Sequence, residues 1–159
     1  MIPSPARRVG VISDTHGLLR PQALALLEGC ELILHGGDIG RPEVLEKLAE
    51  IAPVVAVRGN VDRDGGTEKL PATEAVAFAG HWFYLLHNLA ELDFDLKTAG
   101  FSAVIYGHSH QPCISRREGV LYFNPGSAGP RRFSLPVGLG LLEIAGDELA
   151  ARIVDIAAV

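Results

Sequence analysis

The sequence is poor in cysteine and has no long apolar run. Only two cysteines occur in 159 residues, Cys30 and Cys113, and both lie in apolar stretches. Two cysteines are too few for a disulfide framework or a cysteine-rich zinc site, so we expect reduced, buried thiols. No apolar run approaches the roughly 18 residues of a membrane-spanning helix, so we predict no membrane association.

Positive charge is also scarce. The chain has 14 Lys and Arg against 19 Asp and Glu, a formal net charge of -5. It has no dense basic stripe and no alternation of basic and aromatic residues of the kind that follows a nucleic-acid backbone, so extended nucleic-acid binding is disfavoured. Residues 1–8 lack the charged-then-apolar order of a signal peptide, which predicts a cytoplasmic protein.

No internal repeat, low-complexity tract or linker divides the chain. With 159 residues, of which 48% are hydrophobic, it can fill one core and is too short for two ordinary domains. We therefore predict a single domain over residues 1–159.

The predicted elements alternate between strands and helices first and are mostly strands later. Pro21 and Pro42 each begin a helix at a first-turn position, and a third helix is predicted over residues 91–98. Later strands are predicted over residues 75–79, 82–86, 102–106, 113–117, 120–123, 137–144 and 148–154. Hairpin turns are predicted at Gly80, Gly119 and Gly146. This order predicts parallel strands followed by antiparallel additions, an α/β class with hairpins.

Five apolar runs each end in side chains that can bind a metal ion. Asp14 and His16 are two positions apart, so in an extended segment both face one side. Asp38 follows a glycine pair and Asn60 follows Gly59, and such glycines let the backbone come close to a ligand. The seven candidate ligands are Asp14, His16, Asp38, Asn60, His87, His108 and His110. Together they predict two metal ions at the ends of strands.

Each block taken singly has a structural explanation. An Asp after a buried strand is often a helix N-cap or a turn residue, and the pair His108 and His110 is compatible with a turn. The five blocks jointly favour the metal site. Two histidines fall outside it: we expect His35 to be a hydrogen-bonded structural group and His81, in a hairpin turn, to be solvated.

The ordered blocks Asp-x-His, Gly-Asp, Gly-Asn-x-Asp, a strand-terminal His and Gly-His-x-His resemble those of the calcineurin-like metallophosphoesterases. The small size and the later Asn124-Pro-Gly-Ser127 are similar to the bacterial and archaeal phosphodiesterase branch. The resemblance spans residues 9–127. It implies two mixed β-sheets packed face to face with flanking helices, and metal-binding loops at one edge.

The resemblance also implies a dinuclear metal centre. Asp14, His16, Asp38 and His110 would hold one ion, and Asp38, Asn60, His87 and His108 the other, with Asp38 as the bridge. These donors suit two divalent ions, manganese foremost, with iron, nickel or zinc as alternatives. A water between the ions would lose a proton near neutral pH and attack a small phosphodiester, while Asn60 also binds the phosphoryl oxygens.

Two more polar residues are candidate substrate contacts, Asn124 and Arg131. A turn before proline explains Asn124 equally well, and a solvated charge explains Arg131.

At position 61 many relatives have a histidine that donates a proton to the leaving group, whereas this chain has Val61. The loss of such an acid costs on the order of a hundredfold in rate, most for poor leaving groups. At position 88 relatives usually have a glycine, whereas this chain has Asn88. Asparagine tolerates a left-handed backbone better than most other residues.

Three functions remain open at this point. The first is a two-metal phosphodiesterase, and the second is a phosphomonoesterase of a small metabolite. The third is a protein-interaction scaffold on the same fold, as in the retromer subunit that resembles this family. Such a scaffold need not keep every ligand, whereas here each expected position is filled.

Overall fold

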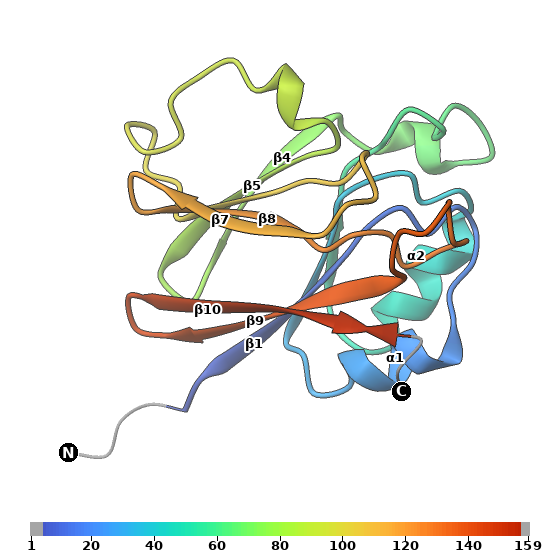
Figure 1. Cartoon of the computed structure of the whole chain (residues 1–159), viewed down its shortest axis with the longest axis horizontal. Helices are drawn as coiled ribbons and strands as arrows, with labels where there is room; N and C mark the ends of the chain where they lie inside the picture. The colour runs from blue at the N-terminus through green and yellow to red at the C-terminus, as the bar shows by residue number, and fades with distance from the viewer. Residues whose placement is uncertain (1–4, 157–159) are drawn as a thin grey trace.

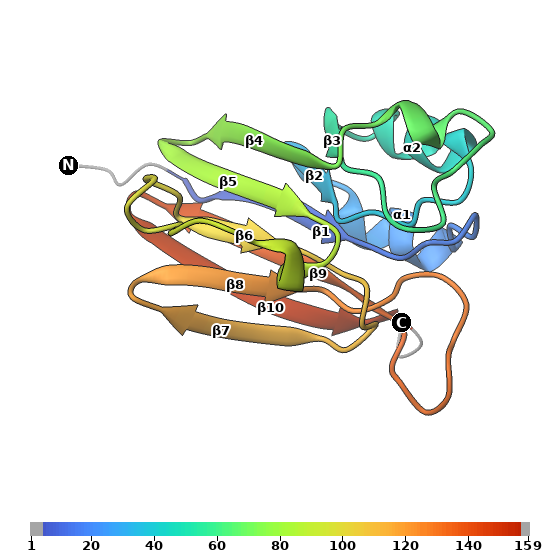
Figure 2. The ribbon, with the colours of Figure 1, turned by 90° about the horizontal axis from the view of Figure 1, so that it is seen from above.

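Two five-stranded sheets pack face to face in the computed structural model of the chain, which describes residues 5–156 (Figure 2). The first sheet has the order β10-β9-β1-β2-β3 and consists of β1 (Arg7–Ile12), β2 (Leu32–His35), β3 (Val54–Ala56), β9 (Gly138–Ala145) and β10 (Glu148–Asp155). The second has the order β4-β5-β6-β8-β7 and consists of β4 (Thr73–Phe78), β5 (His81–Leu86), β6 (Ala103–Ile105), β7 (Cys113–Arg117) and β8 (Val120–Asn124). The expected pair of mixed sheets is confirmed.

Each sheet has three parallel strands that end at one edge. In the first sheet β1, β2 and β3 are parallel, with Ile12 opposite His35 and His35 opposite Ala56. In the second sheet β5, β6 and β8 are parallel, with Leu85 opposite Ile105. Strand β9 runs antiparallel to β1, and hairpins pair β4 with β5, β7 with β8 and β10 with β9, with turns at the three predicted glycines. The loops after the parallel strands are therefore neighbours within each sheet.

Two short helices cover the outer face of the first sheet (Figure 1). They are α1 (Pro21–Leu27) and α2 (Pro42–Ala49), and each has its proline in the first turn, as predicted. Alternate residues of β2 separate two layers of the core: Ile33 packs with the helices, and Leu34 packs with Phe83 of the second sheet. Full burial of each such side chain stabilises the fold by roughly 1.5–3 kcal/mol.

The third predicted helix, over residues 91–98, is wrong. The chain forms only a 3-10 turn, η2 (Leu89–Glu91), followed by irregular turns. The Asp95 carboxylate accepts hydrogen bonds from the backbone N–H groups of Lys97 and Thr98, and such local bonds compete with a helix. Leu96 is buried in the cluster on the outer face of the second sheet. This segment covers that face without a regular helix.

Three other expectations need correction. Cys30 is buried as expected, but Cys113 is exposed because β7 lies at the edge of its sheet. His81 is not solvated: it is buried, with Nδ1 2.7 Å from Ser102 Oγ and Nε2 2.7 Å from Gly146 O. Asn88 has an extended backbone with φ -112° rather than a left-handed one, and its side chain accepts from Ala90 N–H at the start of η2.

Among residues 5–156, no helix is long and apolar enough to cross a membrane.

Candidate metal centre

The seven candidate ligands all follow strands that end at the same edge. Asp14 and His16 follow β1, Asp38 follows β2 and Asn60 follows β3. His87 follows β5, and His108 and His110 follow β6. The first sheet thus supplies four donors and the second sheet three. Their convergence depends on how the two sheets face each other.

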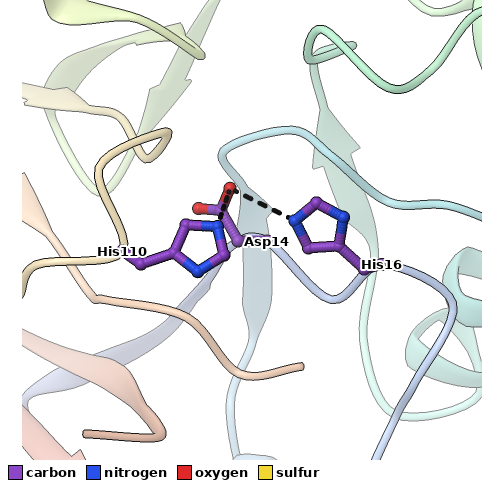
Figure 3. Close-up of side chains that lie close together, drawn as sticks. All are labelled: Asp14, His16 and His110. Atoms are coloured by element: carbon purple, nitrogen blue, oxygen red, sulfur yellow. Dashed lines mark ion pairs between the residues drawn. The ribbon is translucent and has the colours of Figure 1, made fainter. Parts of the chain in front are cut away.

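The carboxylates of Asp14 and Asp38 lie among three imidazoles. Asp14 Oδ1 is 3.4 Å from His110 Nε2 and 3.9 Å from His16 Nε2, and Figure 3 shows this carboxylate between the two rings. Nε2 of His87 lies 3.2 Å from Asp38 Oδ2 and 3.8 Å from Asp14 Oδ1. Asp38 Oδ2 is also 3.6 Å from His16 Nε2. Asp38 and Asp14 therefore each contact histidines of both expected ligand sets.

The other two candidate ligands lie on the open side of this cluster. His108 Nδ1 is 3.3 Å from Asn60 Oδ1, and the ring of His108 lies 5.2 Å from that of His87. Both His108 and Asn60 are exposed and line an open groove of about 250 Å³. Its other lining residues are Arg58, Gly59, Ala72, His87, Asn88 and Glu91. A ligand can therefore reach the cluster from the side of His108 and Asn60.

Several buried polar atoms of the cluster have no hydrogen-bond partner within the described residues. They are Oδ1 of Asp14, Nε2 of His16, Nε2 of His87 and Nδ1 of His110. A buried polar group left unpaired costs roughly 1–3 kcal/mol, so four in one cluster call for a missing partner. Two triads have donor atoms mutually within 4.8 Å: Asp14 with His16 and His110, and Asp14 with Asp38 and His87. The donor set fits divalent cations.

The protonation of the cluster also suits a cation. Burial raises the pKa of Asp38, but the close contact with His87 and the hydrogen bond from Val61 N–H outweigh it, and the pKa is lowered overall. Burial lowers the pKa of His16, and the nearby carboxylates of Asp38 and Asp14 do not fully offset this. Asp38 is therefore ionised and His16 neutral at pH 7, which are the forms that bind metal ions.

His87 shows the opposite tendency. Burial lowers its pKa, but the contact with Asp38 and the charge of Asp14 outweigh burial, and its pKa is raised overall. Nδ1 of His87 lies 2.8 Å from Gly36 O, which leaves Nε2 facing the carboxylates. A cation near Nε2 of His87 would compete with a proton on that nitrogen.

The backbone of the site is strained. Five of the seven candidate ligands have left-handed backbone angles: Asp14 (φ 54°), His16 (47°), Asp38 (57°), His108 (74°) and His110 (62°). Such conformations cost of order 1–3 kcal/mol each in non-glycine residues and cluster at functional sites. The strain is distributed over the loops after β1, β2 and β6.

Two glycines let the backbone approach the carboxylates. A Cβ on Gly59 would lie 2.1 Å from Asp38 Oδ1, and one on Gly107 would lie 2.4 Å from Asp14 Oδ2. Backbone N–H groups lie at the same carboxylates: Val61 N–H donates to Asp38 at 3.0 Å and His108 N–H donates to Asp14 at 3.2 Å. The glycines before Asn60 and His108 are therefore part of the carboxylate environment.

Asp62 has a structural role that its place in the sequence did not predict. This buried carboxylate accepts hydrogen bonds from the N–H groups of Ile39, Gly40 and Gly59. It ties the loop that carries Asp38 to the loop that carries Asn60. The sequence feature that could have indicated this role is the Asp at the last position of the Gly-Asn-x-Asp block.

His35 is a buried structural group, as expected. Its Nδ1 accepts from Gly37 N–H at 3.0 Å, and its Nε2 lies 3.1 Å from Thr15 Oγ1. Burial lowers the pKa of His35 to about 4. A neutral His35 therefore joins the loops that carry His16 and Asp38.

The two candidate substrate contacts lie apart from the groove lining. Asn124 is 1% exposed, and its Nδ2 donates to Gly107 O and Ser109 Oγ while its Oδ1 accepts from Gly126 N–H. Its contacts hold the loop of His108 and His110. Arg131 is exposed and lines a different, smaller pocket.

Two facing sheets thus gather Asp, His and Asn side chains at one edge, and comparison with known proteins shows which family has this arrangement. Residues 8–147 match the family model described as the calcineurin-like phosphoesterase superfamily domain. The chain belongs to this superfamily, which confirms the resemblance seen in the sequence.

Individual relatives support this assignment. A probable metallophosphoesterase of Methanothermobacter thermautotrophicus is 35% identical over 158 residues, covering 92% of this chain and 91% of that protein. Phosphodiesterase YfcE of Escherichia coli is 30% identical over 156 residues, covering 82% of this chain and 84% of that protein. The solved structure of Vacuolar Protein Sorting 29 from Cryptosporidium parvum has a TM-score of 0.76 at 18% identity, covering 96% of this chain and 98% of that chain. That last likeness concerns the fold alone.

Proposed function

We propose that this protein is a two-metal phosphodiesterase that hydrolyses small phosphodiesters. The observation that carries the proposal is the set of four unpartnered buried polar atoms, which lie in one cluster of carboxylates and imidazoles. The family assignment and the phosphodiesterase name of the YfcE relative support the reaction class.

The proposed ligand sets are those that the family resemblance implies, and the gathering of these side chains at one edge supports them. One cation would be held by Asp14, His16, Asp38 and His110, and the other by Asp38, Asn60, His87 and His108. The mixed carboxylate, imidazole and amide donors suit manganese foremost. When bound, the two ions would lower the pKa of a coordinated water and offset the charge that develops on the phosphoryl group.

The residues of the open groove would bind and orient the substrate. Asn60 and His108 border it, so their side chains would meet the phosphoryl oxygens first. The groove of about 250 Å³ has room for one ester group, with Arg58 and Glu91 on its lining. The side chain at position 61 has no proton to give to the leaving group. Val61 is 42% exposed, and its backbone N–H donates to Asp38. The site therefore favours esters whose leaving groups depart without protonation.

The test is hydrolysis of bis(p-nitrophenyl) phosphate by the manganese-loaded protein. We expect His108→Ala to lower kcat at least a hundredfold, because an exposed ligand is lost without disturbing the core. Gln111→Ala is the matched control, since it truncates an exposed residue of the same loop. Full activity of His108→Ala, or of chelator-treated enzyme, would contradict the proposal.

The same assay separates the alternatives. Faster turnover of p-nitrophenyl phosphate than of the diester would identify a phosphomonoesterase. A folded protein that binds no manganese and hydrolyses neither compound would identify a scaffold.

A further inference from the structure

A second polar pocket lies beside the loop that follows β8. It has a volume of about 80 Å³ and is lined by Arg20, Gln22, Arg131, Val137 and Ile156. A single water needs only about 10–15 Å³ measured in this way, so the pocket holds several waters or one tetrahedral oxyanion. Figure 2 shows the loop between β8 and β9, in orange, extending away from the sheets.

The charged side chains that line this pocket are of one sign. Among the described residues, its lining has two arginines and no acidic residue. Val137 and Ile156, which are 2% and 1% exposed, make its apolar part. An anion beside two guanidinium groups and an apolar wall is less screened than in open water. The pocket therefore favours an anionic guest.

The hydrogen bonding of Arg20 gives independent support. Its Nη2 donates to Gly129 O at 3.1 Å, but its Nε is buried and has no hydrogen-bond partner within the described residues. An unpaired buried donor of a charged group is costly. The described residues therefore leave Arg20 incompletely paired, and an oxyanion in the pocket would add an acceptor beside its guanidinium group.

The guanidinium group of Arg131 is weakly bonded within the described residues. Its Nη1 donates a long hydrogen bond to Leu135 O at 3.4 Å. Guanidinium groups bind phosphate and carboxylate oxygens in pairs, and two arginines at one small pocket match a tetrahedral oxyanion.

The pocket is connected to the metal cluster through the backbone. Arg20 holds the carbonyl of Gly129, and a Cβ on Gly129 would lie 2.3 Å from Thr15 O and 2.6 Å from Asp14 O. The neighbouring Ala128 N–H donates to Ser13 O at 3.0 Å. The loop segment that Arg20 contacts thus packs against the loop that carries Asp14.

We infer that Arg20, Gln22 and Arg131 form a binding site for a phosphate-like oxyanion, separate from the metal cluster. The oxyanion is either free phosphate or an additional phosphate group on the substrate. Its binding does not require that the metal centre be active.

The first test is a calorimetric titration of the chelator-treated protein with inorganic phosphate. We expect saturable binding that Arg131→Ala weakens at least about tenfold, because one of two guanidinium groups is lost. Arg132→Ala is the matched control: it removes the same charge from the adjacent exposed residue and should change the affinity less than about twofold. No saturable binding by the wild type, or equal weakening by both variants, would overturn the inference.

A second measurement identifies the source of the oxyanion. With manganese present, KM is compared for the p-nitrophenyl ester of thymidine 5′-phosphate with and without a 3′-phosphate. A KM raised by Arg131→Ala only for the compound with the additional phosphate supports a substrate subsite. Unchanged KM for both, together with lost phosphate binding, supports a site for free phosphate. Because the titration is done without metal, its failure is distinguishable from failure of the proposed phosphodiesterase activity.

Discussion

At the residue scale, His35 couples protonation to the stability of the site loops. The neutral ring accepts from Gly37 N–H and lies against Thr15. The folded protein keeps it neutral down to a pKa of about 4, whereas the unfolded chain protonates it near 6.5. Between these values the unfolded state binds more protons, so stability falls as the pH falls from about 6.5 to about 4.

His35→Gln should remove this pH dependence. Over that interval the metal-free wild type should lose on the order of 3 kcal/mol of unfolding free energy more than the variant. Urea unfolding of both proteins at several pH values measures this difference. Parallel stability curves for the two proteins would show that His35 does not titrate as described.

Val61 limits the range of leaving groups. It is exposed beside Asp38 and Asn60, and a valine side chain has no proton to donate. Val61→His should raise kcat for an alkyl ester by roughly tenfold or more, and change it little for a p-nitrophenyl ester. Val61→Asn is the control for polarity without acid function. Equal effects on both esters would mean that position 61 does not assist the leaving group.

At the element scale, the site depends on loops whose glycines lie against carboxylates. Gly107→Ala would place a methyl group 2.4 Å from Asp14 Oδ2 and 2.1 Å from Ser13 Oγ. We expect a loss of roughly 2–4 kcal/mol in unfolding free energy and weaker manganese binding, because Asp14 must shift. Denaturant unfolding and a manganese titration measure the two effects.

Gly80→Ala is the control for Gly107→Ala. Gly80 is at a hairpin turn with φ 82°, and a Cβ there meets no atom within 4 Å. It should cost about 1 kcal/mol through the backbone alone and leave manganese affinity unchanged. Manganese affinity lowered equally in both variants would contradict the role given to Gly107.

The sequence predicted most elements because their signals are local. Apolar runs and first-turn prolines located the strands and both helices, and glycines located the hairpins. The predicted helix over residues 91–98 failed because Asp95 bonds its own backbone neighbours, a competition that apolar spacing does not report. The burial of His81 was missed because its partners, Ser102 and Gly146, are distant in sequence.

At the scale of the whole molecule, the candidate ligands come from both sheets. The sequence indicated which side chains are candidates for the site, because each follows an apolar run. It could not give their left-handed backbones, the bracing by Asp62 or the protein contacts of Asn124, since these depend on how the two sheets pack. The expected single domain over residues 1–159 stays a prediction.

A cation bound between the sheets should stabilise the entire fold. Binding to the folded state alone adds about 2.7 kcal/mol at a free concentration 100 times Kd. We expect manganese to raise the midpoint of urea unfolding of the wild type, and to raise that of His108→Ala much less. Unfolding curves that do not change with manganese would mean that manganese does not bind preferentially to the folded state, or does not bind at all.

A manganese anomalous difference map from crystals of the loaded protein would test the dinuclear centre most directly. We expect two peaks on either side of Asp38, one beside His16 and His110 and the other beside His87 and His108. A map with no peak at Asp38, or with manganese bound only elsewhere on the chain, would contradict it.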